Sequence, residues 1–143
     1  MLDLGKRKTI DLLIEQFWKN GYMTVSRRFG TYLPEPSKVG NFTVDIIAKQ
    51  KKNYAIGITL TVEDFKDPGI LEKIIYLATR QTKYTGKSVL LYIGVNTIYY
   101  KNAKVLIEKI DPQIQKNIRL VQISERLPHA TAGSRKSRNV LFS

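Results

Sequence analysis

The sequence predicts an α/β fold in which helices flank a mixed central sheet, and three observations support this. Apolar residues recur at helical spacing over about residues 6–20. Two strand-like segments, 42–48 and 54–62, are separated by a short polar run, as expected of an antiparallel hairpin. A helical segment then leads into the almost wholly apolar stretch 88–95, typical of a strand covered on both faces.

The elements of the first half follow from local signals. The first helix is expected to end near residue 20, where an Asn-Gly pair stops it. A strand is expected at 22–26, and the stretch 30–41 is expected to be a loop because it contains two prolines and two glycines. The polar run 49–53 is the expected turn of the hairpin.

The second half begins with Asp67-Pro68, which predicts a helix start: an N-cap acceptor followed by proline at the first helical position. The strand, helix and strand from 54 to 95 then form a parallel crossover, which is expected to be right-handed. A further helix is expected at about 102–110 and a last strand at 118–123.

The chain divides into two segments of different composition. We expect one α/β domain over residues 1–123, a length that suits a single core. Residues 124–143 are small, polar and basic with an apolar end, so we expect a basic, flexible C-terminal tail that is disordered alone or docked on a partner.

The charge is the strongest global feature of the chain. It has 24 Lys and Arg against 12 Asp and Glu, a formal net charge of +12 and a pI of about 9.9. Such an excess attracts polyanions, and nucleic acid is the commonest polyanion in a cell. A solvated, lysine-rich surface without a polyanionic partner is the alternative interpretation.

Several classes of site are excluded or disfavoured by composition. The chain has no cysteine, which excludes disulfides, thiolate zinc sites and cysteine nucleophiles. The only histidine, His129, lies in the tail beside Pro128, so a histidine-based triad is not expected. Neither GxxxxGK[ST] nor GxGxxG occurs.

The absence of targeting signals sets the expected location. No apolar run approaches the ~18 residues of a membrane span, and the start lacks the features of a secretion signal. We therefore expect no membrane association and a cytoplasmic protein, associated with the nucleoid if prokaryotic. The lysine-rich, cysteine-free composition is compatible with a thermophile.

The hairpin carries a resemblance to a known family. The segments FTVDIIA (42–48) and YAIGITL (54–60), in this order of elements, resemble the PD-(D/E)xK nuclease superfamily, and within it most closely the archaeal Holliday-junction resolvases. The resemblance covers roughly residues 5–123. It implies a restriction-endonuclease-like fold with an α-β-β-β-α-β core, a Mg²⁺-dependent endodeoxyribonuclease site and a homodimer acting on branched DNA.

The family chemistry requires an aspartate opening the second strand and a Glu-x-Lys in the third, which hold Mg²⁺ and stabilise charge during phosphodiester cleavage. By this resemblance Asp45 takes the aspartate position, while Gly57 and Thr59 stand where the glutamate and lysine belong. Glycine offers no ligand and threonine carries no positive charge. An early-helix glutamate of the resolvases would fall near Ile10 or Asp11, and only Asp11 could partly replace it. The site is therefore expected to be incomplete.

Two questions about this site stay open in the sequence. The missing ligand could have moved to Asp11, Glu63 or Glu72, which would rebuild a Mg²⁺ site around Asp45. Alternatively, Asp45 binds no metal and pairs with one of the nearby arginines or with a lysine, as a carboxylate among apolar residues should. The candidate arginines are Arg27 and Arg28.

Basic clusters predict how DNA would be held. We expect contacts with backbone phosphates, which position a protein without reading sequence. The predicted nucleic-acid-binding residues are Lys6, Arg7, Lys8, Arg27, Arg28, Lys49, Lys51 and Lys52. Tyr54, Tyr99 and Tyr100 are candidates for stacking on bases, although packing at a strand edge is the commoner role of such tyrosines.

Three functions are therefore weighed. The first is a non-cleaving, nuclease-like DNA-binding protein of recombination or repair. The second is an active, structure-selective endonuclease with a relocated site. The third is a protein-interaction module whose tail docks on a repair or replication protein.

Overall fold

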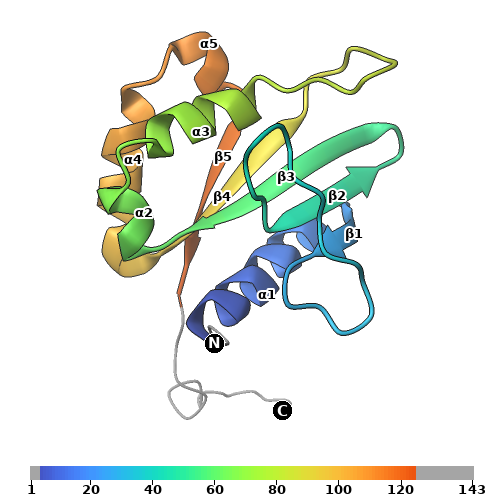
Figure 1. Cartoon of the computed structure of the whole chain (residues 1–143), viewed down its shortest axis with the longest axis horizontal. Helices are drawn as coiled ribbons and strands as arrows, with labels where there is room; N and C mark the ends of the chain where they lie inside the picture. Colours follow the sequence, from blue (N-terminus) through green and yellow to red (C-terminus); the bar gives the residue numbers. More distant parts are fainter. Residues whose placement is uncertain (1–3, 125–143) are drawn as a thin grey trace.

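Residues 4–124, which the computed structural model describes, form a five-stranded mixed sheet with helices on both faces (Figure 1). The strands are β1 (Met23–Arg27), β2 (Ile46–Gln50), β3 (Asn53–Leu60), β4 (Leu90–Asn96) and β5 (Ile118–Ile123). The helices are α1 (Leu4–Lys19), α2 (Val62–Lys66), α3 (Ile70–Ala78), the 3₁₀ helix η1 (Thr97–Tyr99), α4 (Tyr100–Glu108) and α5 (Pro112–Gln115).

The strands lie in the sheet in their order along the chain. β1 pairs with β2 and β2 with β3 in antiparallel fashion, while β3, β4 and β5 run parallel. The hairpin and the parallel crossover expected from the sequence are thus confirmed, as is the α/β class with a mixed sheet.

Two hydrophobic clusters cover the two faces of the sheet. On one face α1 packs Leu13 and Phe17 against Ile46 and Tyr92. On the other face α3, α4 and the segments around them pack onto the alternate residues of β3 and β4. Burial on both faces explains why the central strands are apolar at nearly every position.

The strand β2 begins later than expected. Residues 42–45 do not belong to it, because Phe42 turns back to form an isolated bridge with Val39. Asp45 alone of these residues continues the backbone pairing: its N–H donates to the Gly57 carbonyl at 3.0 Å, and its carbonyl accepts from the Arg28 N–H at 2.9 Å. The hairpin turn shortens to Lys51 and Lys52, since Gln50 still pairs with Asn53.

The segment after β3 also differs from the expectation. Val62 opens the short helix α2, because the Asp64 carboxylate accepts a hydrogen bond from the Thr61 backbone N–H at 2.7 Å and fixes the helix start there. Asp67 ends α2 rather than starting the next helix. Its carboxylate accepts from the Gly69 N–H at 2.8 Å, and α3 begins at Ile70.

Two further expectations concern membrane-spanning helices and the C-terminal tail. No helix among residues 4–124 is long and apolar enough to cross a membrane. The predicted tail, with His129, lies outside the described residues except for Ser124.

Candidate functional site

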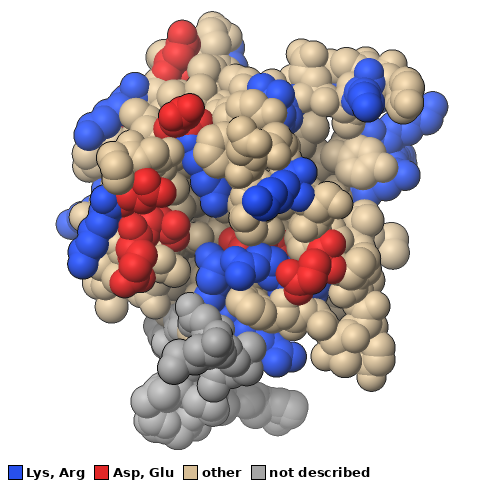
Figure 2. Space-filling model, in the orientation of Figure 1, with Lys and Arg blue, Asp and Glu red and all other residues tan. Residues whose placement is uncertain are grey.

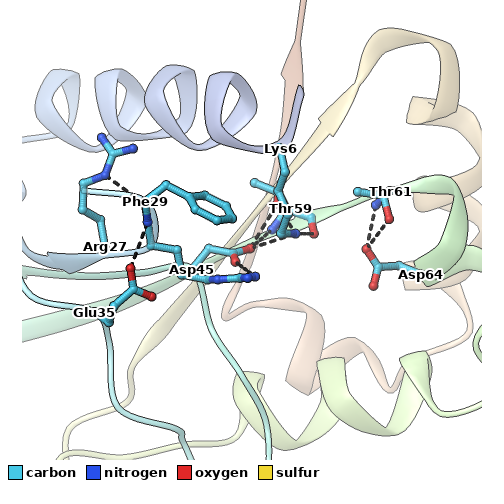
Figure 3. Close-up of polar contacts among 9 residues, drawn as sticks. Lys6, Arg27, Phe29, Glu35, Asp45, Thr59, Thr61 and Asp64 are labelled. Atoms are coloured by element: carbon cyan, nitrogen blue, oxygen red, sulfur yellow. Dashed lines mark hydrogen bonds and ion pairs between the residues drawn. The ribbon is translucent and has the colours of Figure 1, made fainter. Parts of the chain in front are cut away.

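Asp45 lies just before β2, beside the end of β3, and is only 4% exposed. Its Oδ2 atom accepts two hydrogen bonds from Thr59, one from the backbone N–H at 2.8 Å and one from Oγ1 at 3.0 Å (Figure 3). Thr59 is therefore the residue that holds the Asp45 carboxylate in place.

Two cations complete the surroundings of Asp45. Lys6 Nζ, from the first turns of α1, lies 3.5 Å from Asp45 Oδ2 and also donates to Thr59 Oγ1 at 2.8 Å (Figure 3). Arg28 Nη1 donates to Asp45 Oδ1 at 3.3 Å. Both carboxylate oxygens are thus engaged by protein cations, an arrangement that matches the second of the two alternatives that the sequence leaves open.

A third cation approaches the same carboxylate from α3. Burial lowers the pKa of Lys73 below its ordinary value of 10.5, and the nearby charges of Lys6 and Arg28 act in the same direction. The negative charges of Asp45 and Asp64 oppose this shift without cancelling it. We refer to Asp45 with Lys6, Arg28 and Lys73 as the Asp45 cluster.

Lys73 was not among the sequence candidates, although a signal for it exists. It lies three residues after Ile70 and four before Leu77, both buried, so it stands on the apolar side of α3. A lysine on the buried side of a helix is unusual enough to mark a site.

The burial of Lys73 gives a pH-dependent prediction. Its pKa is lower in the folded than in the unfolded protein, so the folded state releases the proton first as pH rises toward 10.5. The unfolded state then binds more protons, and the free energy of unfolding rises with pH in that window. We expect this rise to be absent in Lys73→Met, as measured by urea unfolding of both proteins from pH 7 to 10.5. An identical pH dependence in the two proteins would contradict the assignment.

Gly57 leaves no space for the glutamate of the family pattern. A Cβ atom at this position would lie 2.9 Å from Phe17 Cε2 and 3.0 Å from Ile46 Cβ. Phe17 and Ile46 are both fully buried in the cluster beneath α1. The position is therefore committed to packing between β3 and α1.

The three proposed substitute ligands lie elsewhere. Asp11 forms an ion pair with Arg27, with Oδ1 2.7 Å from Nη2. Glu63 and Glu72 are exposed in the first turns of α2 and α3. Among residues 4–124, no three His, Cys, Asp or Glu side chains form a group that could hold a metal ion.

The residues around Asp45 do not fit the divalent metal of the resolvases. A metal on this carboxylate would have to displace Lys6 and Arg28, and Asp45 would be its only carboxylate here because Gly57 supplies no second one. The cluster instead carries an excess of positive charge, since Lys6 and Arg28 pair with Asp45 and Lys73 lies within the electrostatic influence of Asp45 and Asp64.

The other predicted basic residues fall into two groups. Arg7 lies beside Arg27 on the wall of a shallow hollow formed with the loop at 29–33, and Lys8 is exposed on α1. By contrast, the hairpin lysines at 49, 51 and 52 are exposed at the opposite ends of β2 and β3. The structure therefore brings together the basic residues of α1 and β1, and it separates the hairpin from them.

Comparison of the chain with protein-family models, with curated proteins and with solved structures found no match. The Asp45 cluster is therefore interpreted from its own contacts. These contacts describe a buried carboxylate that is paired with two protein cations, Lys6 and Arg28.

Proposed function

We propose that the protein is a nuclease-like DNA-binding protein that does not cleave its substrate and acts in recombination or repair. One observation carries the proposal: the carboxylate at the catalytic aspartate position is held by Lys6 and Arg28 at 3.5 and 3.3 Å. The order of α1, β1 to β3, α3 and β4 agrees with the α-β-β-β-α-β core of the restriction-endonuclease-like fold, which supports the finer fold assignment.

The charge of the cluster favours a phosphate over a metal. In a nuclease of this type the scissile phosphate lies against the metal at the aspartate position. Here the ammonium and guanidinium groups of the Asp45 cluster supply positive charge at that place, and a phosphate is the complementary partner. Figure 2 shows lysine and arginine side chains scattered over one face of the molecule, with groups of acidic side chains between them.

Binding by such a surface is expected to depend on structure and salt rather than on sequence. Phosphate contacts fix the position of a protein on DNA but do not distinguish base pairs. Each neutralised phosphate releases counterions, so affinity falls as salt rises. The expected partner is duplex or branched DNA, and the homodimer implied by the family resemblance stays a prediction.

A salt titration tests the proposal. With about four phosphate contacts, affinity for a labelled four-way junction is expected to fall about 100-fold between 50 and 200 mM NaCl. The double variant Arg7→Ala, Lys8→Ala should weaken binding and flatten this salt dependence, as measured by fluorescence anisotropy. Lys104→Ala, an exposed lysine on α4, serves as the control and should bind like the wild type. Affinity that is insensitive to salt would contradict electrostatic binding.

A further inference from the structure

The turn between β2 and β3 lies beside the segment 79–89 that precedes β4, and the two enclose a hollow of about 380 Å³. Lysines and tyrosines dominate its lining. They are Lys49, Lys52, Tyr54, Lys83 and Tyr84. We refer to this site as the lysine–tyrosine hollow. In Figure 1 the two turns extend from the sheet on the same side, away from the N-terminal end of α1.

The charge of the two turns is of one sign. Residues 48–54 contain three lysines and no acidic residue, and residues 79–89 contain two lysines and one arginine, again with no acidic residue. No carboxylate of either turn is therefore available to neutralise the lysines of the hollow. The chemically complementary ligand is an anion with several charges.

The backbone holds the 79–89 segment in a defined shape. Within it, Thr82 N–H donates to the Lys87 carbonyl at 2.8 Å, and Val89 N–H donates to the Arg80 carbonyl at 3.0 Å. An isolated bridge between Gln81 and Ser88 closes the same segment. The tip is thus a structured turn, which fixes the place of the Tyr84 backbone relative to the hairpin.

The two tyrosines of the hollow have different surroundings. Tyr54 is half-buried, and Lys49 Nζ lies 5.4 Å from the centre of its ring. Tyr84, by contrast, is 96% exposed at the tip of its turn. An exposed aromatic ring flanked by cations is the arrangement by which proteins stack the bases of single strands while neutralising their phosphates.

We propose that the lysine–tyrosine hollow binds single-stranded nucleic acid, with a base stacked on Tyr84 and the adjoining phosphates on Lys52 and Lys83. This inference rests on the proposed function, because it takes the bound polyanion to be a nucleic acid. The hollow is a different site from the Asp45 cluster. Tyr54 precedes Thr59 by five residues of β3, which separates the hollow from the Asp45 cluster by about 17 Å. Two such sites on one protein suit a branched substrate that has both paired and unpaired segments.

The test compares three ligands on the full chain: labelled oligothymidylate, an abasic strand of the same length, and duplex DNA. Tyr84→Leu is expected to weaken oligothymidylate binding about tenfold and to leave the abasic strand and the duplex unchanged, because only stacking is lost. Val105→Ala is the control, since Val105 is an exposed apolar side chain of α4 and belongs to neither proposed binding site. It should bind oligothymidylate like the wild type. Circular dichroism checks that each variant is folded.

The outcomes separate this inference from the proposed function. Wild-type oligothymidylate affinity in Tyr84→Leu, or an equal loss with Val105→Ala, would overturn the stacking site. Equal losses on the thymidylate and abasic strands would also overturn it, since no base would then be involved. If duplex binding fails while Tyr84-dependent thymidylate binding persists, the duplex proposal is wrong and the hollow stands.

Discussion

Substituting Asp45 by asparagine is expected to lower the free energy of unfolding by about 3 kcal/mol, the lower end of the cost of removing one partner from a buried ion pair. The change leaves Lys6, Arg28 and Lys73 close together without their shared counter-charge. Arg28 is partly exposed, which places the effect at the lower end. Urea unfolding of the two proteins at pH 7 measures it.

The control for this substitution is Asp11→Asn. Asp11 also pairs with an arginine from β1, but its side chain is 42% exposed, so its loss should cost less than about 1 kcal/mol. Asp45→Asn should at the same time raise affinity for duplex DNA, because the carboxylate no longer competes with phosphates for Lys6 and Arg28. Equal destabilisation by the two variants would contradict the assignment of Asp45 as the centre of a buried cluster.

Introducing a side chain at Gly57, where the resolvase pattern has a glutamate, is expected to destabilise the fold. Gly57→Ala should lower the free energy of unfolding by about 2 kcal/mol, because overfilling a packed core has this cost. The new Cβ atom meets Phe17 and Ile46 at 3.0 Å or less. Gly57→Glu should cost more, since it also buries a carboxylate without a partner. Thermal and urea unfolding provide the measurement.

A double variant identifies the cause of this loss. If Gly57→Ala is destabilising because it presses on the Phe17 ring, its cost should be smaller in a Phe17→Leu background, where the ring is absent. Additive costs would place the strain elsewhere in the sheet. An unchanged stability in Gly57→Ala itself would show that the position has room for a side chain.

Much of the fold could be predicted because its elements carry regular patterns. The helical repeat of apolar residues located α1, and the strand β5 has the expected bounds Ile118–Ile123. The errors arose where a side chain competes with the backbone pattern. The Asp64 carboxylate accepts a hydrogen bond from the backbone N–H of the N-cap residue Thr61, so a helix begins at Val62, before the predicted start at Asp67. Asp67, which the sequence suggested as an N-cap, instead ends this helix.

The candidate site was predicted only in part. The apolar neighbours of Asp45 indicated that, without a metal, its carboxylate should be paired or hydrated, and Arg28 was one of the candidate partners beside Arg27 and a lysine. Lys6 and Lys73 could not be assigned to it, because each comes from a different helix, one on either side of the sheet, and only the tertiary fold brings them together. The sequence likewise could not show that the Phe17 ring occupies the space where a side chain at position 57 would lie.

The central claim is that the Asp45 cluster binds DNA without cutting it. The most direct test incubates the wild type and Asp45→Asn with a labelled four-way junction and a linear duplex, with and without Mg²⁺ or Mn²⁺, and measures binding and cleavage on the same samples. We predict binding by both proteins in all conditions and no cleavage in any. Metal-dependent cleavage by the wild type that disappears in Asp45→Asn would contradict this account, because Asp45 would then serve a metal and not the cations that surround it.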